Sequence, residues 1–385
     1  MQAARFFYCQ NGFLYEFDSV PDLTGLRVAV IHDWLTGMRG GEKVLEAILD
    51  LCPGADLYTL IHNPGTVSQK ITQRPLFTSF IDSLPFKRKF YRHYLPLFPA
   101  AIERFDLKGY DLIVSSSHCV ARGIIPGPAT PHVSFVHSPM RYVWDMYSEY
   151  FPEKGLKGFI IPFFANYLRM WDVSVSPRVD RYVANSRFVA ARIKRYYGRE
   201  ATVIHPPCIE KISPLPRRPR EDFYLIVSAL VPYKRIDLAL AAFQENGKKL
   251  IVCGSGPEEK KLRRQAGKNT LFRGSLPWAE IEDLLQRCRG LVFPGLEDFG
   301  IVPVEAQAQG CPVIGFGKGG LLETVVEGRT GTFFREQTVS SLQQAIEKHE
   351  RIGYREKDFQ NQARRFTVDR FKQAFGKEIE RALSL

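Results

Sequence analysis

Two glutamates, Glu297 and Glu305, lie eight residues apart in the stretch PGLEDFGIVPVEAQAQGCPVIGFGKGG, which holds few other charges. Glu297 follows the apolar run GLVFP in an expected loop, and Glu305 falls early in the next expected helix. An ionised glutamate only accepts hydrogen bonds, so both side chains suit the hydroxyl groups of a sugar or a ribose. Gly300, between them, lets the backbone approach such a ligand closely. Taken alone, the pair is better explained as a solvated loop glutamate and a first-turn glutamate.

Three more groups of chemically useful residues follow strand-like runs. Gly40 and Gly41 precede a helix whose N-terminus would attract an anion, and a plain turn is the alternative. Lys234 and Arg235 could neutralise a phosphate, and a solvated helix start is the alternative. His137 ends the run HVSFVH, where it could bond a ligand or move a proton. A structural histidine would explain that position equally well.

Short apolar runs alternate with helical stretches along the chain after about residue 26. Nearly every position in these runs is apolar, as expected for strands that are covered on both faces. The alternation predicts an α/β fold with parallel, doubly wound sheets and crossover helices. In such sheets ligands bind at the carboxyl ends of the strands. The residues considered above lie in the turns after strands or beside them, so this edge is the expected site.

With 385 residues, the chain is longer than one ordinary core requires. The stretch from Pro206 to Asp222 contains five prolines and many charges and is the expected interdomain linker. We therefore predict an N-terminal extension over 1–25, a first domain over 26–212, a second domain over 213–365 and a C-terminal helix over 366–385 that packs back on the first domain. In that last helix an apolar face is expected from Phe366, Phe371, Phe375, Ile379 and Leu383.

The composition limits the classes of partner. A net charge of +12 favours acidic partners, such as nucleic acid, an anionic membrane surface or a phosphorylated ligand. The seven cysteines are scattered, with the closest pair 23 residues apart, so reduced thiols are expected and neither a zinc site nor a disulfide framework is. The sequence contains no DxD pair, and no metal or other cofactor is expected. No signal peptide is predicted, and the apolar run Phe159–Ala165 is too short to cross a bilayer.

Five stretches in a fixed order resemble the retaining nucleotide-sugar transferases of glycosyltransferase family 4. The most specific is PGLEDFGIVPVEAQAQGCPVIGFGKGGLLETVVEGRTGTFF, which is close to the E-x7-E region of that family. The others are VPYKRIDLAL, YVANSRFVAARIKRYYG, VIHPP and the early Gly-Gly pair. The resemblance covers nearly the whole chain after about residue 26. It implies the GT-B fold, in which two Rossmann-like domains face each other across a donor cleft.

The resemblance also implies roles for the second domain. Glu305 would hold the nucleotide ribose, Glu297 would meet the hydroxyls of the donor sugar, and Lys234 would neutralise the leaving diphosphate. Backbone N–H groups near Phe299, Gly300 and Ile301 would contact the sugar and the diphosphate. The loop that ends at Leu276 would meet the base.

For the first domain, the resemblance places His137 beside the donor sugar and Gly40 and Gly41 beneath the diphosphate. One position departs from the family pattern. The family commonly has an arginine five residues before the lysine, and here that residue is Ala229. Arg235 is the expected substitute for this second cation.

The implied activity is metal-independent transfer of a hexose to a glycan or a lipid-linked acceptor. The residues of these motifs are most similar to those of bacterial mannosyltransferases that assemble surface polysaccharides such as lipopolysaccharide. This similarity suggests GDP-mannose as the donor. A UDP-hexose is the alternative donor. Nothing in the physical chemistry of the residues separates guanine from uracil.

Two other classes of function stay open at this point. A glycoside hydrolase needs two carboxylates that flank a sugar, about 5–10 Å apart, whereas Glu297 and Glu305 lie on one side of one expected domain. A non-catalytic nucleotide- or RNA-binding protein fits the charge, but no aromatic RNA-binding motif occurs, and we expect no nucleic-acid partner.

Two segments of the first domain suit a membrane surface. LPFKRKFYRHYLPLFP, residues 84–99, combines four Lys or Arg side chains with several aromatic ones and no acid. KGLKGFIIPFFANYLRMW, residues 154–171, combines an apolar patch with cations. They predict a cytoplasmic protein that binds peripherally to the inner face of the cytoplasmic membrane. A core helix with a solvated basic loop is the alternative.

Overall fold

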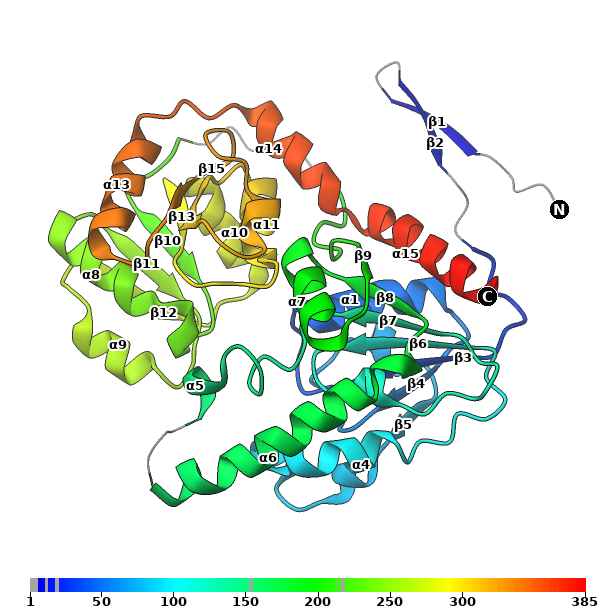
Figure 1. Ribbon diagram of the computed structural model, residues 1–385. Helices are drawn as coiled ribbons and strands as arrows, with labels where there is room; N and C mark the ends of the chain where they lie inside the picture. Colours follow the sequence, from blue (N-terminus) through cyan, green and yellow to red (C-terminus); the bar gives the residue numbers. More distant parts are fainter. Residues whose placement is uncertain (1–5, 11–12, 18–20, 152–154, 213, 216–218) are drawn as a thin grey trace. The chain divides into compact units, whose positions relative to one another are not determined.

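The computed structural model describes the chain except for residues 1–5, 11–12, 18–20, 152–154, 213 and 216–218 (Figure 1). It divides into two compact units. The first contains residues 1–207 and 368–385, and the second contains residues 208–367. The predicted boundaries, after residues 212 and 365, lie within a few residues of this division.

The first unit is built on a seven-stranded parallel sheet with the strand order β5-β4-β3-β6-β7-β8-β9. The order reverses between β3 and β6, which are the first and fourth strands of the sheet along the chain. The strands are β3 (Val28–His32), β4 (Asp56–Thr59), β5 (Leu76–Thr78), β6 (Leu112–Ser117), β7 (His132–Val136), β8 (Arg181–Ala184) and β9 (Ala201–Val203). An antiparallel hairpin, β1 (Phe6–Gln10) and β2 (Phe13–Phe17), precedes them.

Helices cover both faces of this sheet. The longer ones are α1 (Gly40–Leu51), α6 (Gly155–Ser174), α7 (Arg187–Tyr197) and α15 (Val368–Leu383), and the shorter ones are α2 (Gln69–Thr72), α3 (Lys87–Phe90), α4 (Phe98–Ile102) and α5 (Tyr147–Tyr150). The 3-10 segments are η1 (Phe80–Ser83), η2 (Tyr91–Leu97), η3 (Ala121–Gly123) and η4 (Ser176–Arg178). Apolar side chains of α1 and α15 pack on one face of the sheet, and those of α4 and α6 pack on the other.

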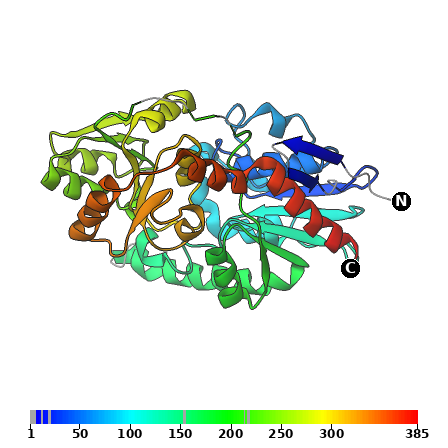
Figure 2. The ribbon, with the colours of Figure 1, turned by 90° about the horizontal axis from the view of Figure 1, so that it is seen from above.

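The C-terminal helix α15 belongs to the first unit, where it packs against α1 and β7 (Figure 1, Figure 2). Phe371, Phe375 and Ile379 are buried in the cluster that includes α1. The other two residues of the predicted face lie elsewhere. Phe366 is buried in the second unit against Phe299, and Leu383 is exposed.

The second unit contains a six-stranded parallel sheet with the order β12-β11-β10-β13-β14-β15. The strands are β10 (Tyr224–Val227), β11 (Leu250–Cys253), β12 (Thr270–Gly274), β13 (Gly290–Phe293), β14 (Val313–Phe316) and β15 (Gly331–Phe334). The helical segments are η5 (Pro232–Lys234), α8 (Ile236–Asn246), α9 (Glu259–Gln265), α10 (Trp278–Arg287), α11 (Ile301–Ala308), α12 (Leu321–Thr324), α13 (Val339–Glu350), α14 (Glu356–Ala363) and η6 (Arg364–Phe366). This is the doubly wound strand order of dinucleotide-binding folds, and the predicted fold class is confirmed.

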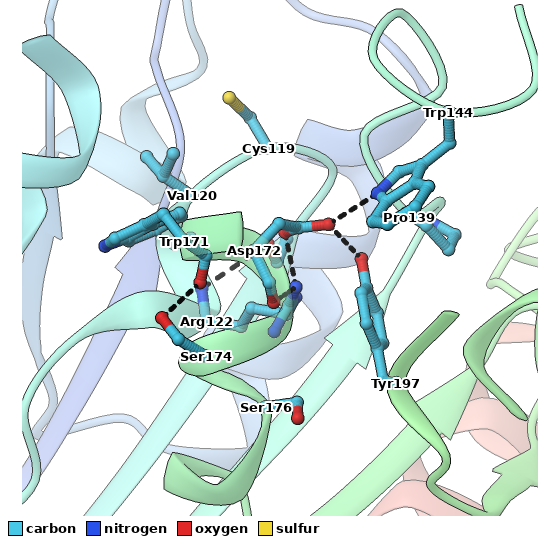
Figure 3. A network of polar contacts seen from close by, with 12 residues as sticks. Cys119, Val120, Arg122, Pro139, Trp144, Trp171, Asp172, Ser174, Ser176 and Tyr197 are labelled. Carbon is cyan, nitrogen blue, oxygen red and sulfur yellow. Dashed lines mark hydrogen bonds and ion pairs between the residues drawn. The ribbon is translucent and has the colours of Figure 1, made fainter. Parts of the chain in front are cut away.

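A buried ion pair ties together four segments of the first unit (Figure 3). Arg122, in η3, is 1% exposed and pairs with Asp172 of α6, whose carbonyl oxygen also accepts from the guanidinium at 2.7 Å. The other carboxylate oxygen of Asp172 accepts from Trp144 Nε1 and from the hydroxyl of Tyr197, each at 2.8 Å. The guanidinium lies 4.0 Å from the centre of the Tyr197 ring. This network fixes α6 to η3, to the loop after β7 and to α7.

Candidate active site

In the second unit the strand order reverses between β10 and β13, and the predicted residues Lys234 and Glu297 lie just beyond the carboxyl ends of these strands. The Lys234 ammonium and the Glu297 carboxylate form an ion pair. Their side chains are only 17% and 14% exposed. Lys234 Nζ also lies 5.8 Å from the centre of the Phe293 ring at the end of β13. A cation and a carboxylate are therefore held together at the point where this fold class binds ligands.

Glycines let the neighbouring loops approach this ion pair. A Cβ atom on Gly320 would lie 2.2 Å from the carbonyl oxygen of Asp298, and one on Gly295 would lie 2.9 Å from the Cα of Lys234. The N–H of Gly320 donates to the carbonyl of Glu297 at 2.9 Å. Any larger side chain at these two positions would push the loop of Glu297 away from Lys234.

The loop of Glu297 runs directly into α11. Gly300 caps this helix with φ +92°, a backbone conformation that favours glycine. The ring of Phe299 is buried against Phe366 and is therefore not exposed to a ligand. Ile301 begins α11, and Glu305 is buried in its second turn. The helix N-terminus with its partial positive charge therefore follows Glu297 directly in the chain.

Two other predicted residues of this unit make contacts of their own. Arg235 has φ +52° and its guanidinium pairs with Asp237 at 3.2 Å, so the adjacent cations Lys234 and Arg235 serve different carboxylates. Leu276 follows β12 and is partly buried against the apolar cluster beneath α10.

In the first unit the strand order reverses between β3 and β6, and three predicted residues lie near that point. Gly40 and Gly41 are the first residues of α1, and His137 follows β7. A Cβ atom on Gly41 would lie 3.6 Å from Cε1 of His32 and 3.9 Å from the ring of His137. The structure thus brings Gly41 and His137 together around His32, a residue that was not predicted to belong to the site.

Ser116 connects the two histidines. Its hydroxyl lies 2.8 Å from Nε2 of His137 and 3.1 Å from Nδ1 of His32. His118 joins the group from the loop after β6, with its ring centre 6.2 Å from that of His137 and 6.0 Å from that of His32. His32, Ser116 and His118 could have been found in the sequence only as polar residues at the ends of two apolar runs, VIHD and VSSSH.

Asp33 fixes the loop that carries His118. Its carboxylate accepts the backbone N–H groups of residues 118 to 121 at 2.6, 2.9, 2.7 and 2.8 Å and lies 3.1 Å from Nδ1 of His118. Burial raises the pKa of Asp33, and these N–H donors oppose that shift. The carboxylate thus acts as an anchor for the loop after β6.

The three histidines of this group are neutral near pH 7. Burial, followed by the repulsion between the protonated forms of His32 and His118, lowers the pKa of His32 to about 4. Burial, followed by Arg141, Arg39 and Arg92, lowers the pKa of His118 to about 3. Burial and the other two histidines hold the pKa of His137 well below its usual value. Each ring therefore carries a single N–H proton.

Comparisons with known proteins agree with this description. The family model Glycosyltransferase Family 4 matches residues 55–209, and the model Glycosyl transferases group 1 matches residues 209–366. Together they cover most of the chain, with one model on each side of the division between the two units.

Individual relatives match over shorter stretches. The GDP-mannose-dependent alpha-(1-6)-phosphatidylinositol monomannoside mannosyltransferase of Mycolicibacterium smegmatis is 30% identical over 207 residues, 46% of this chain and 52% of the relative. The O-antigen chain mannosyltransferase C of Escherichia coli is 28% identical over 190 residues, 45% of this chain and 49% of the relative. The chain thus spans about half the length of these curated relatives.

The fold has solved counterparts. The crystal structure of Anabaena Alr3699/HepE in complex with UDP superposes with a TM-score of 0.65 at 17% identity and covers 92% of this chain and all of that one (100%). At this identity the likeness establishes the fold alone.

Proposed function

As this chain belongs to glycosyltransferase family 4, we propose that it is a retaining hexosyltransferase that moves a sugar from a nucleotide-sugar donor to a glycan or lipid-linked acceptor. The observation that carries this proposal is the Lys234–Glu297 pair at the strand-order reversal of the second unit. A hexosyl diphosphate could bind both side chains, because its phosphates attract the Lys234 ammonium and its sugar hydroxyls donate hydrogen bonds to the Glu297 carboxylate.

In the proposed reaction the bond between the anomeric carbon of the sugar and the diphosphate breaks, and negative charge develops on the leaving diphosphate. The oxygen of the acceptor's hydroxyl group bonds to that carbon on the same face, and the hydroxyl proton passes to the leaving diphosphate. Lys234 and the N-terminus of α11 stabilise that charge without a metal ion. Glu297 accepts hydrogen bonds from the donor sugar, and Glu305 accepts them from the ribose. His137, Gly40 and Gly41 keep the roles that the family implies, which are contacts to the donor sugar and to the diphosphate.

We propose GDP-mannose as the donor, with a UDP-hexose as the alternative. The names of two relatives support mannose transfer, and one of these names specifies GDP-mannose. A structural counterpart was solved with UDP.

A thermal-shift series with GDP, UDP, ADP and dTDP tests the donor. The ligand that binds the folded protein tightest raises its Tm most, by mass action. We expect GDP to give the largest increase at equal concentration. A larger increase with UDP would replace GDP-mannose by a UDP-hexose, and the absence of a shift with all four would contradict the proposed nucleotide site.

We also propose that the first unit binds the inner face of the cytoplasmic membrane. Among the residues described, no helix has the length and apolar character that crossing a bilayer requires. One side of α6 packs in the core through Ala165 and Leu168. Its other side exposes a row of apolar residues, which are Phe159, Ile160, Phe163, Phe164, Tyr167, Met170 and Val173.

A basic segment with exposed aromatic residues contributes to the same apolar cluster as α6. Arg88, Lys89 and Arg92 are exposed there. Phe86 is 76% exposed and has φ +55°, a conformation that is strained for a bulky residue. Exposed rings with cations suit the interface of an anionic bilayer, where each Lys or Arg contributes about 1 kcal/mol.

Flotation with anionic vesicles at low salt tests this proposal. We expect the wild-type protein to float and the double variant Phe159→Ser/Phe163→Ser to bind at least about tenfold more weakly, because each buried phenylalanine contributes about 1.5–3 kcal/mol. Leu322→Ser, at an exposed leucine of the second unit, is the control that should still float. Failure of the wild-type protein to float would exclude the membrane role.

A further inference from the structure

We propose that Ser116 and His32 are positioning residues that fix the tautomer of His137, so that Nδ1 carries the proton and presents an N–H donor. The pair lies at the strand-order reversal of the first unit, where β3 and β6 are direct neighbours and His32 is opposite Ser116. The tautomer follows from hydrogen bonding alone. Only the hydrogen bond from Nδ1–H of His137 to the donor sugar rests on the proposed function.

The Ser116 hydroxyl has one proton and two histidine neighbours, at 2.8 Å and 3.1 Å. No other hydrogen-bond acceptor lies within reach of this hydroxyl in the described part of the chain, so accepting from both rings would leave its own buried proton without an acceptor. It therefore donates to one ring and accepts from the other. In the first arrangement His32 Nδ1–H donates to Ser116, and Ser116 donates to Nε2 of His137. In the second arrangement both bonds are reversed, and His32 then carries its proton on Nε2.

The environment of His32 distinguishes these arrangements. His32 is fully buried, and its Nε2 has no hydrogen-bond partner within the described part of the chain. The second arrangement would bury an N–H without an acceptor, and such orphaned donors are rarer in native proteins than unsatisfied acceptors. The first arrangement leaves only a lone pair there.

A neighbouring histidine shows what a purely structural arrangement looks like. His132 is also fully buried, but Ser115 bonds its Nε2 at 2.8 Å and the carbonyl of Arg178 bonds its Nδ1 at 2.9 Å. Ser115 and Ser116 are adjacent in β6 and point to opposite faces of the sheet. His132 is therefore satisfied on both nitrogens, whereas His32 is satisfied only toward Ser116.

The consequence concerns the ligand of His137. Nε2 is taken by Ser116, so Nδ1 is the ring nitrogen that remains for a ligand. As a donor it selects an oxygen that accepts a hydrogen bond, such as a sugar hydroxyl or a phosphate oxygen. While Nδ1 of His137 holds its own proton, it cannot take a proton from the hydroxyl group of the molecule that receives the sugar.

Long-range proton–nitrogen correlation spectra of the ligand-free protein, labelled with ¹⁵N-histidine, test the tautomer. The signals of His137 are assigned by their loss in His137→Gln. We expect the Nδ1–H form of His137 to exceed the Nε2–H form by at least about tenfold, given the cost of an unmade buried hydrogen bond. A dominant Nε2–H form would overturn the proposal.

Variants test which residues impose the tautomer. Ser116→Ala and His32→Leu should each reduce the excess of the Nδ1–H form, whereas His32→Asn keeps a donor toward Ser116 and should preserve it. Ser115→Ala, on the opposite face of the sheet, should leave the His137 signals unchanged. An unchanged tautomer in Ser116→Ala would overturn the positioning role. If a variant fails to fold, the wild-type spectrum still decides the tautomer.

Titration with GDP-mannose and with a UDP-hexose separates this inference from the proposed function. A shift of the Nδ1–H signal on binding supports the contact with the donor. An unmoved Nδ1–H signal in a protein that binds donor would contradict the role of His137 in the proposed function and leave its tautomer established.

Discussion

Replacing Lys234 by alanine is expected to lower kcat by about 10²–10³-fold, with a much smaller change in KM for the donor. The magnitude is that of removing one preorganised donor to developing negative charge. The leaving diphosphate gains charge in the transition state, so the ammonium interacts more strongly there than with the bound donor, and its loss appears mainly in kcat. Initial rates at varied donor concentration measure both constants.

The control should remove a cation of the same unit that lies away from the site. Lys348 is exposed and pairs with Glu327, so Lys348→Ala is expected to keep kcat within about twofold, as for surface changes in general. The same assay with EDTA examines the proposed independence from metal ions. If Lys234→Ala keeps kcat/KM within a few-fold of the wild-type value, Lys234 does not neutralise the leaving group.

The fold could be predicted from the sequence because its strands are nearly continuous apolar runs. VAVIH and LIVC, for example, are buried along their whole length in β3 and β11. The apolar face of α15 was predicted only in part. Helical spacing grouped Phe366 with Phe371, although the chain passes from the second unit to the first between residues 367 and 368. Spacing in a sequence does not show against which core a side chain packs.

The candidate sites depend on strand order, which local sequence patterns do not contain. Lys234 and Glu297 were selected separately, and their ion pair exists because β13 lies next to β10 in the sheet. His32 and Ser116 are 84 residues apart and were not selected, since polar residues at the ends of apolar strands have many ordinary explanations.

The cysteines also show that strand order cannot be read from local sequence. Cys288 and Cys311 are the closest pair in the sequence, yet their 23-residue separation gave no reason to expect them in contact. The structure buries both thiols with their sulfur atoms 3.3 Å apart, because the strands β13 and β14 that follow them are neighbours. Both cysteines are free thiols in this structure.

Replacing Asp172 by alanine should destabilise the first unit by about 3–5 kcal/mol, the usual cost of removing one partner of a buried ion pair. The substitution leaves the Arg122 guanidinium buried without its counter-charge and removes the acceptor of Trp144 and Tyr197 (Figure 3). Three of the four tryptophans, Trp34, Trp144 and Trp171, belong to this unit, so the midpoint of urea unfolding measured by tryptophan fluorescence reports mainly on it.

Two further variants identify the uncompensated charge as the cause. The double replacement Arg122→Met/Asp172→Leu removes both charges at similar volume and should recover much of the lost stability, because buried ion pairs and apolar pairs are often nearly equivalent. Glu200→Gln breaks the exposed Lys194–Glu200 pair of the first unit and should move the midpoint little. If the double variant is no more stable than Asp172→Ala, the loss comes from the broken packing of α6 against η3 and α7, and the charge of Arg122 is not its source.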